Sequence, residues 1–167
     1  MIVGVFMKAL IAVGCLLFSA ILADAPTNLL KPANQLDSWR VESTDGGKCT
    51  ATIKDDAIVF DVTEVDSTDW HVQAVQTDLD LKDGTTYVLR FKAMSPENKS
   101  IAVNAMIDEE DWHQIGLQEE SYLGKEYREV KMEFRATDVI AKKNRISFVL
   151  GQSKGTVHIK DLSLTAK

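Results

Sequence analysis

Beyond residue 26, apolar and polar residues alternate with a period of two in several stretches of the chain. This period is typical of β-strands, whose successive side chains point to opposite faces of a sheet. No stretch sustains a helical period for long, so we predict strands in the six clearest stretches. Their apolar members are Ile58, Phe60 and Val62; Leu89, Phe91 and Ala93; Ile101, Val103, Ala105 and Ile107; Val130, Met132, Phe134 and Ala136; Ile146, Phe148 and Leu150; and Val157 and Ile159.

Turn-forming residues separate these stretches. Clusters of Gly, Asp, Asn, Ser and Pro occur at residues 45–47, 82–84, 95–98, 123–125 and 153–155. Such residues interrupt regular structure and supply the backbone conformations that tight turns need. Many short strands at this spacing predict an all-β fold, a two-sheet antiparallel β-sandwich.

Two further stretches place polar side chains opposite an apolar face. After residue 111, one face carries Trp112, Gln114, Gly116 and Gln118, and the other carries His113, Ile115 and Leu117. The second face is the one that we assign to the core, and Gly116 would let a ligand approach the sheet closely. In the earlier stretch, Val72 and Ala74 are assigned to the core. Strict alternation places Trp70 with them, unless a bulge or a loop turns it outward.

The tripeptide Asp-Trp-His occurs twice, at residues 69–71 and 111–113, and glutamines follow each copy. A flat indole can stack against the C–H face of a sugar, and amides can hydrogen-bond its hydroxyls. The two copies therefore indicate a glycan-binding site. The alternative is that Trp70 and Trp112 are core residues at the start of two strands.

The N-terminus resembles a secretory signal peptide. Lys8 is followed by an apolar run of 15 residues that ends in small residues, and this run is shorter than the ~20 residues of a membrane span. We predict a signal peptide at residues 1–25, with cleavage after Ala23 or Ala25, and a single β-sandwich domain at residues 26–167. Met7 is an alternative start, and an uncleaved membrane anchor is the alternative to cleavage.

Charge and cysteine content narrow the set of partners. Removing Lys8 from the 19 basic residues changes the net charge from −6 to −7, and no basic patch is evident. This argues against binding to nucleic acid or, after signal cleavage, to a membrane. Cys15 leaves with the signal peptide, so Cys49 has no internal disulfide partner. The predicted location is secreted, periplasmic or extracellular.

Several segments, taken in their order and spacing along the chain, together resemble carbohydrate-binding modules of families 4, 9 and 22. The resemblance runs from Asn28-Leu29-Leu30 through residues 69–73, 81–93, 127–134 and 146–151 to residues 155–164. It implies a galactose-binding-like jelly roll that binds a polysaccharide or oligosaccharide in a cleft on one sheet. By position it implies that the cleft contains Trp70, Gln73, Trp112, Gln114, Asn104 and Arg145.

The resemblance also implies a structural calcium ion and a set of partners. Asp161 matches a usual calcium ligand of the family, whereas Lys31 to Leu36 replace the usual opening segment, and no cofactor is required for binding. Such modules are usually joined to a catalytic domain, so a separate glycoside hydrolase or surface protein is an expected partner. The asparagine of Asn98-Lys99-Ser100 is a candidate N-glycosylation site if the source is a eukaryote.

The sequence carries no strong signature of an enzyme. It has no Gly-x-Ser-x-Gly elbow, no phosphate-binding glycine loop and no His-x-x-x-His motif. The acidic run at residues 108–111 is typical of a solvated loop, although glycosidases use paired carboxylates. We therefore predict a secreted, non-catalytic carbohydrate-binding module. The alternative is a protein-interaction or assembly domain without sugar binding, and burial of both tryptophans would decide for it.

Overall fold

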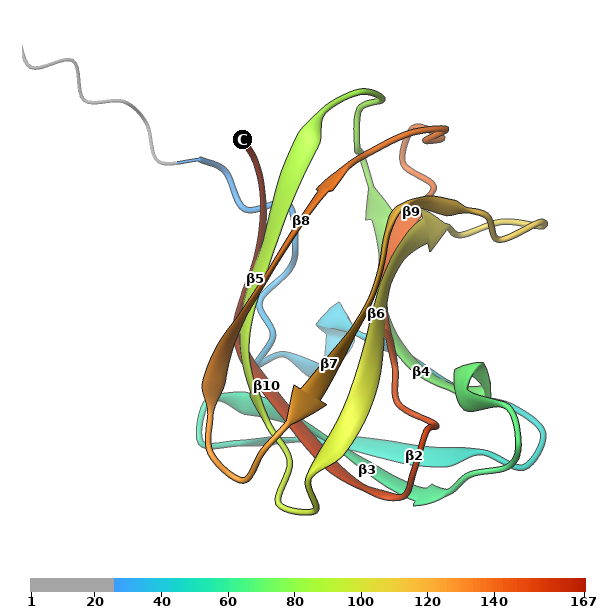
Figure 1. Ribbon diagram of the computed structural model, residues 1–167, viewed down its shortest axis with the longest axis vertical. Coiled ribbons are helices and arrows are strands. Elements are labelled where there is room, and N and C mark those ends of the chain that lie inside the picture. The colour runs from blue at the N-terminus through green and yellow to red at the C-terminus, as the bar shows by residue number, and fades with distance from the viewer. Residues whose placement is uncertain (1–25) are drawn as a thin grey trace, which may run out of the picture.

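The strands form two antiparallel sheets that pack face to face (Figure 1). The computed structural model describes residues 26–167. The first sheet has the strand order β1-β4-β9-β6-β7, and the second has the order β2-β3-β10-β5-β8. Every paired strand is antiparallel to its neighbours. The predicted all-β sandwich is therefore confirmed.

The predicted stretches correspond to six of the strands in the described residues. The first sheet consists of β1 (Arg40–Ser43), β4 (Val72–Leu79), β6 (Lys99–Ile107), β7 (Gln114–Leu123) and β9 (Asn144–Val149). The second consists of β2 (Lys48–Lys54), β3 (Ala57–Glu64), β5 (Thr86–Met94), β8 (Arg128–Arg135) and β10 (Gly155–Ala166). Two short 3-10 turns, η1 (Leu36–Ser38) and η2 (Asp69–His71), precede β1 and β4.

The alternating apolar side chains form the core between the sheets. All the apolar members of the six stretches are buried there. Trp39 joins the two layers, because its ring packs edge-on against Phe60 of the second sheet and Phe148 of the first. Its indole nitrogen donates to the carbonyl oxygen of Ala33 at 2.9 Å. Trp39 is thus a core residue, unlike the other two tryptophans.

The central strand of the first sheet is buried on both faces. Ile146 and Phe148 of β9 point into the core. Arg145, Ser147 and Val149 point the other way and are also buried. The outer face of the first sheet is therefore recessed at β9, and neighbouring elements rise around it.

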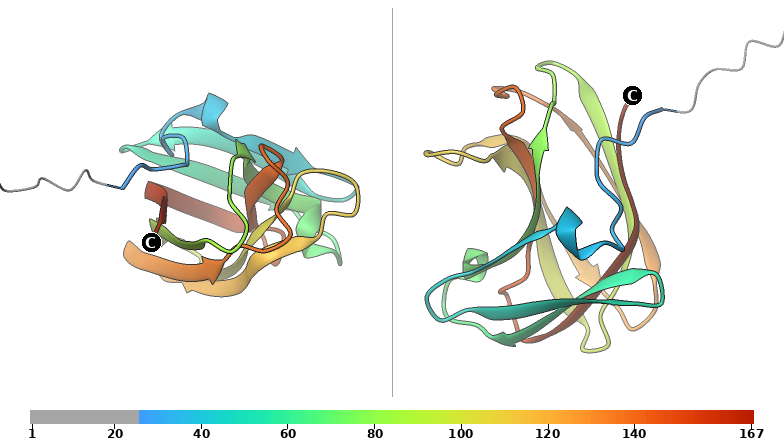
Figure 2. Two further views of the ribbon diagram at one scale, coloured as in Figure 1. Left: turned by 90° about the horizontal axis from the view of Figure 1, so that it is seen from above. Right: turned by 180° about the vertical axis from the view of Figure 1, so that it is seen from behind.

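The two ends of the described chain lie together. Asn28 accepts hydrogen bonds from the backbone N–H groups of Leu30 and Leu164, at 3.1 and 2.9 Å, and its amide donates to the carbonyl of Leu162. Figures 1 and 2 show this first segment running beside β10. Asn28 therefore fixes the start of the domain to its last strand.

The predicted signal peptide, residues 1–25, lies outside the described residues. Within residues 26–167, no helix has the length and apolar character needed to span a bilayer.

Candidate functional site

An open cleft of about 830 Å³ lies on the outer face of the first sheet. Its floor comes from all five strands, whose outward residues stand side by side in register. The cleft is lined by Glu42, Asp69, Trp70, Gln73, Ala102, Asn104, Met106, Trp112, Gln114, Gln118, Glu119, Glu120, Arg145 and Val149. The structure therefore brings together all six residues that the sequence assigned to a glycan site, and their binding role stays a prediction.

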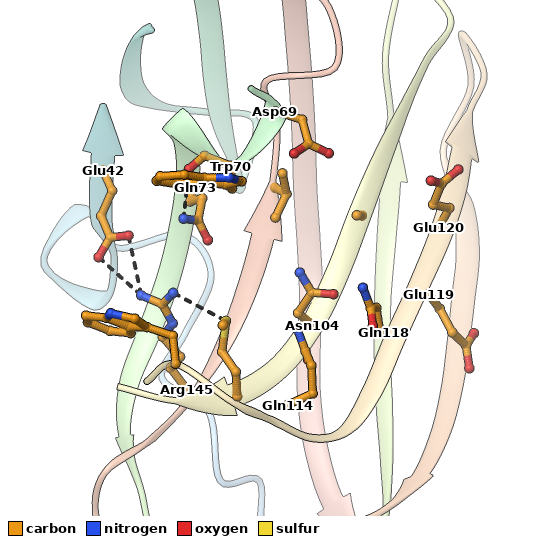
Figure 3. A pocket seen from close by; sticks show the side chains of 14 residues that line it. Glu42, Asp69, Trp70, Gln73, Asn104, Gln114, Gln118, Glu119, Glu120 and Arg145 are labelled. Atoms are coloured by element: carbon orange, nitrogen blue, oxygen red, sulfur yellow. Dashed lines mark hydrogen bonds and ion pairs between the residues drawn. The ribbon is translucent and has the colours of Figure 1, made fainter. Parts of the chain in front are cut away.

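The cleft has two chemically different ends. Figure 3 shows Glu42, Trp70 and Arg145 at one end, and Glu119 and Glu120 at the other. Asn104 and Gln118 lie between the two ends on β6 and β7. Aromatic and amide groups thus share one open surface, an arrangement suited to a ligand with both apolar and hydroxyl faces.

Trp70 is held in the cleft by backbone contacts. It lies in η2, the single 3-10 turn before β4, and 56% of its surface is exposed. Its carbonyl accepts from the Gln73 side chain at 2.8 Å, and the carbonyl of Asp69 accepts from the Gly151 N–H at 3.2 Å. Strict alternation would have buried Trp70, but the 3-10 turn changes the period and rotates the ring outward.

The indole of Trp112 packs against an arginine side chain. It lies in the loop between β6 and β7 with a positive φ of 47°, next to Asp111 at 80°, and 47% of its surface is exposed. Such φ values are uncommon for residues other than glycine. The Arg145 guanidinium lies 4.8 Å from the centroid of the indole, which is cation–π distance. One face of Trp112 thus packs on Arg145.

Arg145 belongs to an ionic network beneath the cleft. It is 4% exposed, and its Nη1 lies 3.4 Å from both Glu42 and Asp108. Arg40 makes two shorter contacts to Asp108, at 2.6 and 2.9 Å. The hydrogen bond from Arg40 lowers the pKa of Asp108 below its usual value. The network therefore joins β1, β9 and the residue that follows β6 under Trp112.

The predicted amides differ in how much hydrogen-bonding capacity they leave free. Gln73 is 6% exposed, and it accepts from Ser147 while donating to Trp70. The Gln114 amide nitrogen donates to the carbonyls of Ala105 and Leu117, at 3.0 Å each, when it is oriented toward them. Both side chains thus use much of their hydrogen-bonding capacity within the protein, where they hold neighbouring segments of the cleft in place.

Two buried polar atoms in the cleft lack a partner among the described residues. They are the side-chain oxygen of Asn104 and the Nε of Arg145. Buried polar atoms are nearly always paired, so each of these two atoms is a candidate to bind water or, after a small side-chain movement, a ligand. A hydroxyl group can donate to the first and accept from the second.

Gly116 has a structural role that the sequence did not reveal. It has a φ of 120° at the β-bulge in β7, and a Cβ added there would lie 2.2 Å from the carbonyl oxygen of Arg135. The glycine therefore lets β7 approach the chain at the end of β8, and the approach of a ligand there stays a prediction. His113 also differs from the prediction, since it lies in the loop outside the core.

His113 closes the loop that carries Trp112. Its two ring nitrogens contact Asp111 and the carbonyl oxygen of Asp138, both at 2.8 Å. The backbone contact to Asp138, together with Asp111, raises the pKa of His113. The second tripeptide is therefore fixed by its own aspartate and histidine as well as by Arg145.

Several cleft residues were missed from the sequence. Gln118 could have been found from the sequence, because it shares a face with Gln114 on β7. Nothing in the sequence distinguishes Asp69, Glu119 and Glu120 from ordinary solvated acids. Glu42 lies on a strand of only four residues, which is too short to show a clear alternation. Gln76, by contrast, follows the first tripeptide but is 2% exposed and binds the backbone of Lys31.

The carboxylate of Asp161, the predicted calcium ligand, is engaged by a lysine. Its carboxylate pairs with Lys92 at 2.9 Å. Within residues 26–167, no group of three or more acidic, histidine or cysteine side chains could hold a metal. Calcium needs six to eight oxygen ligands, several of them usually carboxylates. The calcium site at Asp161 therefore stays a prediction without a visible set of side-chain donors.

The candidate enzymatic groups are occupied by structural contacts. In the acidic run, Asp108 pairs with arginines, Glu109 with Lys143 and Asp111 with His113. Burial raises the pKa of the Cys49 thiol to about 11, which keeps it protonated at neutral pH.

Comparison with known proteins places the chain among sugar-binding domains. The family model described as carbohydrate binding domain, CBM_4_9, matches residues 29–155. No curated protein sequence matches the chain.

Solved structures share the fold. One described as "CBM4 structure and function" is 20% identical with a TM-score of 0.72, over 86% of this chain and 96% of its own. The N-terminal cellulose-binding domain of Cellulomonas fimi β-1,4-glucanase C is 22% identical with a TM-score of 0.63, over 81% and 92%. The second such domain of that enzyme is 19% identical with a TM-score of 0.69, over 86% and 97%.

Proposed function

The chain belongs to the CBM_4_9 family of carbohydrate binding domains, and we propose that its cleft holds a glycan chain between Trp70 and Trp112. The observation that carries this proposal is that both indoles are exposed and line one cleft. Burial of both would have decided for the interaction-domain alternative. Their exposure therefore favours sugar binding.

The physical chemistry of the cleft supports weak, reversible binding. Each aromatic stacking contact adds about 0.5–1.5 kcal/mol beyond the burial of area. Each hydrogen bond contributes about 1 kcal/mol after exchange with water. Small side-chain movements that expose the unpaired atoms of Asn104 and Arg145 would let each gain a partner from a sugar hydroxyl. After the entropy cost of association, we expect micromolar to millimolar dissociation constants.

The charges of the cleft favour a neutral glycan. The lining contains four carboxylates and one cation, Arg145. That cation is buried and directed at Glu42, Asp108 and the indole of Trp112. A uronic acid or a sulfated sugar would face Glu119 and Glu120 without a free cation in the lining. A chain of neutral sugars meets no such repulsion.

We propose that the domain acts without catalysis and without a required cofactor. Three of the four acids at residues 108–111, namely Asp108, Glu109 and Asp111, are tied in ion pairs, which supports a structural role for them. We further propose that the domain is secreted after removal of residues 1–25. There it would direct a separate glycoside hydrolase or a surface protein to a polysaccharide.

The test is retention of the mature chain on affinity gels that contain cellulose derivatives, xylan or mannan, together with a neutral and acidic glycan array. We expect retention on at least one neutral glycan, loss of it in Trp112→Ala, and no binding to polyuronates. Ile53→Ala, an exposed apolar residue on the second sheet, is the matched control. Retention that is unchanged in Trp112→Ala would refute the proposal. Parallel gels with calcium and with chelator test the predicted ion.

A further inference from the structure

One exposed aromatic residue is not explained by the cleft. Within residues 26–167, three aromatic side chains are strongly exposed: Trp70, Trp112 and Tyr122, the last at 57%. The two tryptophans line the cleft, whereas Tyr122 lies outside its lining. An aromatic ring in water leaves a large apolar area unburied, so a solvated ring on a binding face suggests a contact with a ligand.

Tyr122 lies on the same face of the first sheet as the cleft. It belongs to β7, where Ser121 and Leu123 are buried and Gln118, Glu120 and Tyr122 point outward. It stands two residues beyond Glu120, which places it about 7 Å farther along the strand. Its register partner on β6 is Ser100, just as Ala102 is the partner of Glu120. The outward face of the cleft thus continues without interruption to Tyr122.

No contact within the protein accounts for the position of Tyr122. Among the described residues, its hydroxyl makes no hydrogen bond, and its ring makes no aromatic or cation–π contact. The other two tyrosines differ in this respect. The Tyr87 hydroxyl accepts from the backbone of Lys82, and the Tyr127 ring lies 4.1 Å below the Lys160 ammonium.

We propose that Tyr122 forms a further subsite, which stacks a neutral sugar ring of the same chain where that chain leaves the cleft across β7. This inference rests on the proposed function. A glycan held between the tryptophans and crossing the floor passes Asn104 on β6 and then Gln118 on β7, the edge strand that also carries Tyr122. A ring at Tyr122 would then take one more sugar, which only longer chains can supply.

The test is the dependence of affinity on chain length. Calorimetry would compare the trisaccharide with the hexasaccharide of the neutral polysaccharide on which the gels retain the protein. The wild type should bind the hexasaccharide more tightly, and Tyr122→Ala should reduce the ratio of the two affinities by roughly two- to tenfold. Tyr122→Phe keeps the stacking ring and should preserve the ratio, and Ile53→Ala should behave as wild type.

Three results would overturn the subsite. The ratio could be unchanged in Tyr122→Ala, the loss could be equal at both lengths, or Tyr122→Phe could lose as much as the alanine variant. Trp112→Ala separates this proposal from the proposed function, since it should weaken binding of both lengths. If the wild type binds neither oligosaccharide, both proposals fail. Thermal unfolding of each variant confirms that the fold is intact.

Discussion

The two copies of Asp-Trp-His present their indoles to one cleft but are supported in different ways. The first copy forms the turn η2, whose carbonyl groups are held by Gln73 and by the N–H of Gly151. The second copy is a loop with positive φ angles, and its indole rests on Arg145. The same three residues therefore depend on backbone packing in one place and on buried charge in the other.

This difference shows that a local motif does not determine how its side chains are held. Trp70 is positioned by neighbours that lie three and 81 residues along the chain, at Gln73 and Gly151. The Arg145 network under Trp112 joins residues up to 103 positions apart. If both indoles bind one glycan, each type of support can be removed separately.

The largest expected effect comes from removing the indoles themselves. Trp70→Ala and Trp112→Ala should each lower the affinity for the neutral glycan that retains the protein on the gel. The expected loss is at least about tenfold, or about 1.4 kcal/mol. Both side chains are about half exposed, so the free energy of unfolding should change by no more than about 0.5 kcal/mol. Calorimetry and thermal unfolding measure the two quantities. A variant that binds as tightly as Ile53→Ala would show that its indole is not a binding surface.

The next effect separates the support of Trp70. A Cβ at Gly151 would lie 2.2 Å from the carbonyl oxygen of Asp69, so Gly151→Ala must displace η2. Such overpacking costs about 1–3 kcal/mol of stability, and the displaced turn should lower the affinity several-fold. Adding Trp70→Ala should then cause little further loss of affinity, as titration of the double variant would show. Full additivity of the two losses would contradict the link from Gly151 to Trp70.

A smaller effect should follow from removing the cation under Trp112. Arg145→Met keeps the length of the side chain but loses the guanidinium, its ion pairs and the cation–π contact. The cation–π contact alone is worth about 0.5–2 kcal/mol, so we expect a loss of affinity of about twofold to tenfold. Arg145→Lys keeps the charge without the planar fork and should recover only part of it. Equal affinity of Arg145→Met and the wild type would show that Trp112 needs no cation.

The smallest effect is the pH dependence of that network. Because Arg40 lowers the pKa of Asp108, the ion pair is complete above the ordinary aspartate pKa of about 3.9 and is lost as the pH falls through the lowered value. The contribution of Asp108 to affinity should therefore be constant from neutral pH to about pH 4 and decrease below it. Titrations of wild type and Asp108→Asn across this range test the prediction. If the affinities of the two proteins differ by the same factor at every pH, the prediction is contradicted.

Much of the fold could be predicted because alternation is a local property. Residues such as Ile101, Val103 and Ala105 point into the core because β6 is regular. Trp70 could not be assigned, because the 3-10 turn that rotates it depends on contacts with Gly151 and Thr68. The structural role of Gly116 could not be predicted, because the carbonyl that it accommodates belongs to Arg135 on a strand of the other sheet.

The candidate site was predicted in its membership but not in its division of roles. The family resemblance put Gln73 and Arg145 near the tryptophans, and both line the cleft. It could not show that Gln73 holds Trp70 and that Arg145 supports Trp112, because those contacts depend on the register of β4, β9 and β6. Tyr122 drew no attention in the sequence, because its exposure follows from the position of β7 at the edge of the sheet.

The most direct test of the account uses the indole N–H signals of the three tryptophans in a nitrogen-15 NMR spectrum. The hexasaccharide of the polysaccharide that retains the protein on the gel is titrated into the labelled mature chain. The spectra of Trp70→Phe and Trp112→Phe assign the signals. We predict that the Trp70 and Trp112 signals shift together with one dissociation constant. The signal of Trp39, whose indole nitrogen is bound to Ala33 in the core, should stay in place. Binding that leaves the Trp70 and Trp112 signals unmoved would contradict the claim that these two indoles hold the glycan.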